Sequence, residues 1–344
     1  MNTSTPNHTE SMDVAVLILF FNRPEALKAV FEQVRKVRPA QLFLYQDGPR
    51  NERDLPGIAA CRQIVEYIDW PCEIHRKYQE KNLGCDPSEY ISQKWAFSFV
   101  EKCIVLEDDD IPSLSFFTFC KEMLDRYADD RRISMITGCN YDEVTPDMPY
   151  DYFFATTFSI SGWASWRRVI EEWDASYSWL DDDFNCGQLE DYIKERKYQS
   201  NFIDFCRYHR KTGKAYYETI FHAAIFFSSG MSIVPRVNLI NNLGACGEGV
   251  HLSGTNETLP KAYRRIFEMK RHELNFPLRH PRYVIENVRY KDRMFRIMGW
   301  GHPWIKIGRS FEELWLNLQH GNISQIGHAI ANRIRILTGH SKFD

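Results

Sequence analysis

Along the first part of the chain, short apolar runs alternate with segments in which apolar and polar positions mix. A continuous run such as Val14–Phe20 is typical of a strand buried on both faces of a parallel sheet. The alternation predicts four strands, which are Val14–Phe20, Leu42–Tyr45, Cys72–Tyr78 and Cys103–Leu106. It predicts three helices between them, which are Glu25–Val37, Ile58–Ile68 and Glu89–Val100. This βαβαβαβ order predicts an α/β fold with a mainly parallel open sheet flanked by helices.

The later part of the chain is less regular. Ile133–Ile136 and Met231–Val234 predict two further strands, and roughly the last fifty residues predict helices interrupted by Gly and Pro. We expect a flexible N-terminus over residues 1–12, a main domain over 13–287 and a helical extension over 288–344.

Composition narrows the class of protein. The formal charge of −3 over 344 residues lacks the Lys/Arg excess of a general nucleic-acid binder, so no nucleic-acid partner is expected. Nine scattered cysteines without a C-x-x-C pair argue against structural zinc and for reduced thiols. Residues 1–12 lack the apolar core of a signal peptide, and no apolar run reaches the length of about 18 residues that a membrane span needs. We therefore expect a cytoplasmic protein.

The sharpest chemical signal is the triplet Glu107-Asp108-Asp109 after the fourth strand. Carboxylates at a buried strand end repel one another and are costly to desolvate, and a divalent cation removes that cost. Oxygen ligands suit Mg²⁺ or Mn²⁺, which typically bind one or two carboxylates plus substrate phosphates. The alternative is a solvated acidic turn.

Arg23 and Asp47 follow the first and second strands. Because parallel strands end at one edge of the sheet, both should lie near the acidic triplet, where ligands bind in such folds. An Asp there can accept the imide N–H of a uracil ring, and an Arg can stack on a ring or pair with phosphate. The alternatives are a salt bridge at a helix start for Arg23 and an Asp-Gly turn for Asp47.

Three further positions suggest substrate contacts. Trp163 and Trp166 follow Gly162 in a stretch that could close as a loop over a ligand and present flat rings to a sugar; the alternative is a structural aromatic cluster. Glu218, beside aromatic residues, could act as a general base or simply begin a helix. His251, in a Gly-rich segment, could bind metal or be structural.

Taken in order, these segments resemble a known family. The matching residues are Val14–Pro24, Gln46-Asp47-Gly48, Glu107-Asp108-Asp109, Gly162–Trp166 and Pro235–Gly244. The ordered set resembles the N-acetylglucosaminyltransferase I group of GT-A glycosyltransferases and, more closely, its bacterial hemolytic-protein-like or family 2-like relatives. The resemblance spans about residues 13 to 285 and is more specific than any one of its motifs.

The resemblance implies a GT-A catalytic domain over 13–287 that transfers a hexosyl or N-acetylhexosaminyl group, with inversion, to a glycan or lipid-linked acceptor. It implies a nucleotide diphosphate donor, preferably UDP, bound by Arg23, Asp47, Glu107 and Asp108, with Mn²⁺ or Mg²⁺ at Asp109. Relatives carry an Asp at the position of the base, where this chain has Glu218. A polysaccharide pathway is also implied.

Two other functions fit the sequence. A nucleotidyltransferase would also place acidic residues at a sheet edge, although no G-x-x-x-x-G-K-[ST] loop is present. A degenerate, non-catalytic protein would bind a glycan or a partner, and Glu218 in place of Asp favours it. The extension over 288–344 mixes aromatic and basic residues, so it either packs on the main domain or lies peripherally on the inner face of a membrane.

Overall fold

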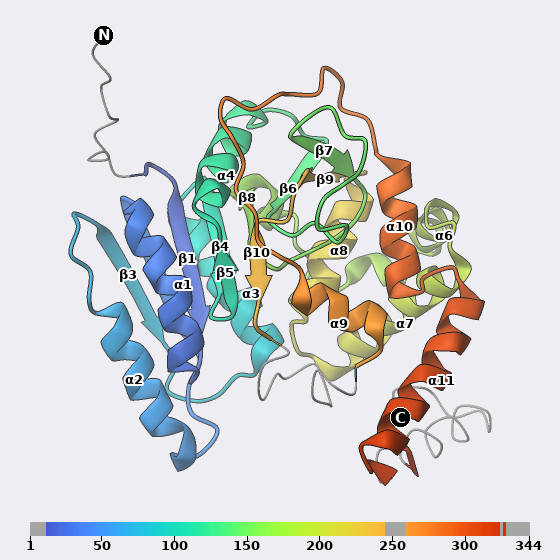
Figure 1. Ribbon diagram of the computed structural model, residues 1–344, viewed down its shortest axis with the longest axis horizontal. Helices are drawn as coiled ribbons and strands as arrows, with labels where there is room; N and C mark the ends of the chain where they lie inside the picture. The colour runs from blue at the N-terminus through green and yellow to red at the C-terminus, as the bar shows by residue number, and fades with distance from the viewer. Residues whose placement is uncertain (1–11, 245–258, 324–325, 328–344) are drawn as a thin grey trace.

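The computed structural model describes residues 12–244, 259–323 and 326–327. Its centre is an eight-stranded sheet in the order β3-β2-β1-β4-β8-β6-β9-β7, covered by helices on both faces (Figure 1). The strands are β1 (Ala15–Phe20), β2 (Gln41–Gln46), β3 (Glu73–Tyr78), β4 (Lys102–Glu107), β6 (Ile133–Thr137), β7 (Tyr152–Ala155), β8 (Trp163–Trp166) and β9 (Met231–Pro235). A separate two-stranded ribbon joins β5 (Asp110–Pro112) to β10 (Ile240–Asn242). The predicted α/β fold with a mainly parallel open sheet is confirmed.

The first four strands of the sheet are all parallel, as the sequence predicts. Every residue of β1 is buried, because β1 lies between β2 and β4 and helices cover both of its faces. The connecting helices are α1 (Pro24–Val37), α2 (Leu55–Val65) and α3 (Cys85–Phe99). Pro24 begins α1, where its fixed φ suits the first helical position. The carboxyl ends of β1, β2 and β4 therefore share one edge.

The other half of the sheet is mixed. The predicted strands near Ile133 and Met231 are confirmed as β6 and β9, which pair in parallel. Strand β8 runs antiparallel between β4 and β6, and β7 runs antiparallel to β9. The stretch from Trp163 to Trp166 is therefore a buried strand, and the prediction of a loop there is wrong. An antiparallel strand inserted between two others gains its burial from neighbours remote in sequence, which a local pattern does not reveal.

The remaining helices pack around this mixed half and at the end of the chain. They are α4 (Leu114–Arg126), α5 (Arg167–Glu171), α6 (Asp183–Tyr192), α7 (Arg196–Thr212), α8 (Tyr217–Phe227), α9 (Lys261–Glu268), α10 (Val288–Met298) and α11 (Pro303–Gln319). The described residues also form two short 3₁₀ helices, η1 (Glu52–Asp54) and η2 (Ser178–Asp181). Within the described residues, no helix is both long and apolar enough to cross a bilayer.

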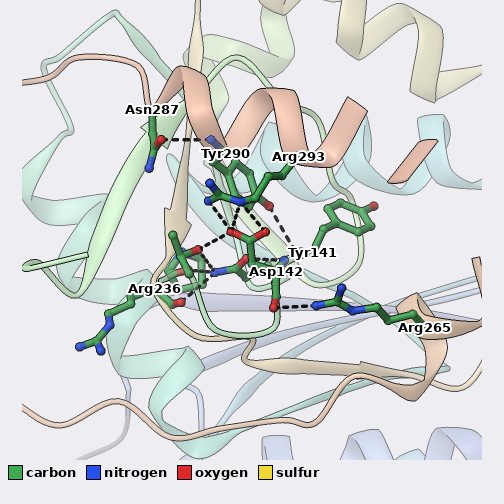
Figure 2. A network of polar contacts seen from close by, with 10 residues as sticks. Tyr141, Asp142, Arg236, Arg265, Asn287, Tyr290 and Arg293 are labelled. Atoms are coloured by element: carbon green, nitrogen blue, oxygen red, sulfur yellow. Dashed lines mark hydrogen bonds and ion pairs between the residues drawn. The ribbon is translucent and has the colours of Figure 1, made fainter. Parts of the chain in front are cut away.

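Helix α10, the start of the predicted extension, is fixed to the main domain by a polar network (Figure 2). Arg293 donates to both carboxylate oxygens of Asp142, with Nε–Oδ1 at 2.9 Å and Nη2–Oδ2 at 2.6 Å. The buried Tyr290 hydroxyl accepts from the backbone N–H of Tyr141 at 3.2 Å. Met294 and Phe295 are also buried. This helix therefore belongs to the folded body, with its apolar side turned inward.

Candidate functional site

Arg23, Asp108 and Asp109 meet at the shared edge of the parallel strands. The Arg23 guanidinium pairs with Asp108 and, through Nη1, with Asp109 Oδ2 at 3.0 Å. Asp108 Oδ2 also accepts from the backbone N–H of Phe21 at 3.2 Å. Residues more than eighty positions apart are thus joined because β1 and β4 are neighbours and end together. Both aspartates are buried, which excludes the alternative of a solvated acidic turn.

The buried environment alters the acidity of Asp108. Burial raises its pKa to about 6, because desolvation disfavours the charged form, while the charge of Arg23 opposes that shift. The guanidinium therefore keeps a buried carboxylate largely ionised near neutral pH.

One carboxylate oxygen of Asp109 is left without a partner by the described part of the chain. Its Oδ1 is buried and accepts no hydrogen bond from those residues, whereas its Oδ2 accepts from Arg23. A buried carboxylate oxygen without a partner is costly, and a divalent cation would satisfy it. The backbone at Gly244 also lies close to Asp109. A Cβ on Gly244 would lie 3.0 Å from Asp109 Oδ2, so a side chain there would crowd this carboxylate.

These observations fit a Mg²⁺ or Mn²⁺ ion held by Asp109. Across residues 12–244, 259–323 and 326–327, no three His, Cys, Asp or Glu side chains converge as a preformed metal site. Because Mg²⁺ often uses only one or two carboxylates plus substrate phosphates, a donor set completed by a nucleotide diphosphate remains compatible. His251, the other predicted metal ligand, lies outside the described residues.

Asp110, which the sequence interpretation left without a role, fixes the surrounding backbone. Its Oδ2 accepts from the backbone N–H of Gly162 at 2.8 Å, and its Oδ1 accepts from Asn242 Nδ2 at 2.9 Å. Burial raises the pKa of Asp110 well above its usual range, and the charge of Asp109 raises it further. The short ribbon of β5 and β10 thus holds the chain beside the predicted metal position.

A second set of carboxylates comes from three elements; of its members Glu89 is buried, Glu107 is half-buried and Glu218 is exposed. Glu107 ends β4, Glu89 projects from α3, and Glu218 is in the first turn of α8, a helix that packs on α3. We call Glu89, Glu107 and Glu218 the glutamate cluster. Burial raises the pKa of Glu89 well above its usual range, with the charge of Glu218 as the next cause. Burial likewise raises the pKa of Glu107, followed by the charge of Glu89.

Two neighbours extend the glutamate cluster. The Cys85 thiol donates to Glu89 Oε1 at 3.4 Å. The Tyr217 hydroxyl is buried without a hydrogen-bond partner among the described residues, and burial and then Glu89 and Glu107 raise its pKa. Neighbouring carboxylates repel one another, and burial adds to the cost of ionising Glu89, so this region favours holding a proton or attracting a cation.

Asp47 holds the loop before α3. Its Oδ1 accepts from the backbone N–H groups of Gly48 at 2.8 Å and Leu83 at 2.9 Å. Its Oδ2 accepts from Asn82 Nδ2 at 2.8 Å and the backbone N–H of Gly84 at 3.1 Å. Asp47 therefore stabilises turns, which is the alternative that the sequence left open. Recognition of a nucleotide base by Asp47 stays a prediction.

The tryptophans are core residues. Trp163 is 1% exposed, and its ring centroid lies 5.1 Å from that of Phe221. Trp166 is also buried, and its Nε1 donates to the carbonyl of Leu124 at 3.1 Å. Rings enclosed on both faces offer no platform to a sugar. The predicted substrate role of these two residues is therefore corrected to the alternative, a structural aromatic cluster.

Comparison with known proteins gives distant similarities. No family model matches the chain, and no curated protein matches it in sequence. Among solved structures, a cytidylyltransferase from Leptospira borgpetersenii is 13% identical with a TM-score of 0.30, over 47% of this chain and 63% of that one. Mouse xyloside xylosyltransferase 1 is 9% identical with a TM-score of 0.36, over 65% of this chain and 85% of that one.

The inositol-1-phosphate CTP transferase of T. maritima is 9% identical with a TM-score of 0.37, over 77% of this chain and 100% of that one. This chain thus spans under two thirds of the Leptospira protein. At such TM-scores, similarity assigns neither a family nor an activity to this chain.

Proposed function

We propose that this chain is an inverting GT-A glycosyltransferase that transfers a sugar from UDP to an acceptor hydroxyl and uses Mn²⁺ or Mg²⁺. The observation that carries the proposal is the buried Oδ1 of Asp109, which has no hydrogen-bond partner among residues 12–244 and 259–323 and lies at the carboxyl edge of four parallel strands. This is the edge at which open α/β sheets bind ligands. The ordered family-like segments described above add to it.

In this proposal the residues divide the work. Arg23 is already oriented by Asp108 and Asp109, and its partly exposed guanidinium would face a phosphate or a base. Asp47 would shape the nucleotide pocket by holding the Asn82–Gly84 turn. Asp109, with Asp108 and Glu107 beside it, would hold the metal. When bound, the metal would neutralise charge on the departing diphosphate.

Glu218 would accept the proton of the acceptor hydroxyl as that oxygen attacks the anomeric carbon. It lies among carboxylates whose pKa values are raised, namely Glu89 and Glu107. Glu89 itself would retain its proton and keep the cluster from excess negative charge.

The first test is calorimetric titration of UDP into the full chain with Mn²⁺ and, separately, with EDTA. We expect metal-dependent binding that Asp109→Asn abolishes, because the substitution removes the charge that the cation needs. Asp129→Asn, at an exposed position away from this edge, is the matched control and should bind as wild type does. Equal binding in EDTA, or binding retained by Asp109→Asn, would contradict the metal assignment.

A nucleotidyltransferase is the second candidate, because the same acidic edge would serve it. The reaction products distinguish the two candidate functions. A glycosyltransferase releases UDP from a UDP-sugar when an acceptor is present, whereas a nucleotidyltransferase releases pyrophosphate from UTP and a sugar phosphate. Metal-dependent UDP binding with pyrophosphate as the only product would replace the first proposal by the second.

A further inference from the structure

Helix α11 is oriented with its polar side toward the body of the protein. Arg309 Nη1 donates to the carbonyl of Met298 at 3.1 Å, and the guanidinium lies 4.2 Å from the centroid of the Tyr263 ring. Glu312 Oε1 accepts from the backbone N–H of Lys261 at 2.8 Å. Asn317 is buried. The helix is thus attached to α9 and to the end of α10 through charged and polar groups.

The opposite side of α11 is apolar and exposed. Its large apolar residues recur three or four positions apart and are 39% to 82% exposed; they are Trp304, Ile307, Phe311, Leu314, Trp315 and Leu318. We call these six residues the α11 stripe. A helix on the surface of a globular protein normally turns such a stripe toward the core, as α10 does. An exposed stripe of this size marks an interaction surface.

Figure 1 shows α11 at the lower right edge of the molecule, beyond α9 and α10. The polar side of this helix already contacts α9 and the end of α10, so the exposed α11 stripe lies on a side that these contacts leave uncovered.

The charge of this part of the chain indicates the kind of partner. From residue 288 to the end there are nine Lys and Arg against four Asp and Glu, a net charge of +5. The whole chain carries −3, so residues 1–287 carry −8. A basic region attached to an acidic body is attracted to anionic lipid head groups. Two copies joined through this region would instead bring two such positive charges together.

We propose that α11 lies flat in the surface of an anionic bilayer, with the α11 stripe inserted at the boundary of head groups and acyl chains. An amphipathic helix with tryptophans and aliphatic residues, within a stretch of sequence that is basic overall, is the kind that binds in this plane. Trp304 and Trp315 are more than half exposed, and indole rings favour the head-group level. Because the polar side of α11 holds the body, insertion would require no change in the fold.

The test is flotation of the full chain with vesicles of phosphatidylcholine alone or with about 30% phosphatidylglycerol, at low salt and at about 0.5 M salt. We expect binding to the anionic vesicles, reduced by high salt. The triple variant Trp304→Ser/Phe311→Ser/Trp315→Ser should reduce the bound fraction about tenfold, because most of the inserted apolar area is removed. Phe184→Ser, on α6 and 71% exposed, is the matched control and should bind as wild type does.

Light scattering after gel filtration, without lipid, accompanies the flotation. A monomer of wild type and triple variant, with lipid binding lost only in the variant, supports the proposal. No binding to anionic vesicles, or binding that the triple variant retains, overturns it. A wild-type dimer that the triple variant converts to monomer, without lipid binding, assigns the α11 stripe to a second copy and also overturns it.

Discussion

Two groups of carboxyl groups lie at the same sheet edge and are stabilised differently. Asp108 and Asp109 share one guanidinium, that of Arg23. In the glutamate cluster, no Lys or Arg of the described residues forms an ion pair with Glu89 or Glu107, and burial raises both pKa values well above their usual range. The first group has a cation built in, whereas burial favours the protonated forms of Glu89 and Glu107. One edge therefore combines aspartates paired with a guanidinium and two glutamates, Glu89 and Glu107, that have no such partner among the described residues.

Removing the built-in cation should have the largest effect. We expect Arg23→Ala to lower the free energy of unfolding by about 3 kcal/mol, because two buried carboxylates lose their partner. This value is at the lower end of the usual cost of removing one partner from a buried ion pair, because the Arg23 side chain is 37% exposed. Urea unfolding at pH 7 without metal measures the change.

Two variants make this test specific. Arg53→Ala, at an exposed arginine, should change stability little, and Arg23→Lys should recover part of the loss because it keeps the charge without the two-pronged geometry. If Arg23→Ala and Arg53→Ala are equally stable, the aspartate pair does not depend on the guanidinium.

The sequence predicts the aspartates of this comparison but not the buried glutamate Glu89. Asp108 and Asp109 were predicted because they follow an apolar strand, and strands buried on both faces have an unmistakable pattern. Glu89 was missed because the buried side of α3 is itself polar, with Ser88, Ser92 and Gln93 beside Glu89. Polar residues thus occupy much of that side, which is buried by tertiary packing of α5, α8 and the sheet on α3.

The predicted loop and substrate role of Trp163 and Trp166 are wrong for a related reason. A Gly-led run dense in Trp looks like a substrate loop. Its antiparallel neighbours, β4 and β6, are remote in sequence: the nearest paired residues, Thr137 and Trp163, are 26 positions apart. Burial of this kind follows from topology and not from local propensity. The orientation of α11 is also invisible to periodicity, which finds the α11 stripe but not the side on which it lies.

Protonation of Glu89 predicts an effect of intermediate size on stability, which depends on pH. In the folded protein the pKa of Glu89 is raised above its ordinary value of 4.5, so above pH 4.5 the folded state holds a proton that the unfolded state has lost. The contribution of Glu89 to stability therefore falls as pH rises through that window, by up to about 1.4 kcal/mol per pH unit.

Glu89→Gln imitates the protonated form and should remove this dependence. We expect it to match wild type near pH 5 and to exceed wild type by about 1–2 kcal/mol near pH 8, measured by urea unfolding without metal. Glu190→Gln, at an exposed position, should follow wild type at both pH values. A Glu89→Gln protein less stable than wild type at pH 8 would show that the ionised carboxylate is preferred there.

The smallest effect should come from Cys85, whose thiol donates to Glu89 Oε1 at 3.4 Å. A thiol is a weak donor, so Cys85→Ala should lower stability by less than about 1 kcal/mol beyond what the lost side chain contributes. The hydrogen bond lowers the pKa of Glu89 against the larger effect of burial, so its removal should raise that pKa further.

A double-mutant cycle of Cys85→Ala and Glu89→Gln at pH 5 and pH 8 isolates the interaction from packing. The coupling should be larger at pH 8, where more of Glu89 is ionised, because a donor stabilises the carboxylate more than the neutral acid. Coupling that is equal at both pH values would mean that Glu89 keeps one protonation state throughout. The ionisation of Glu89 would then not change between pH 5 and pH 8.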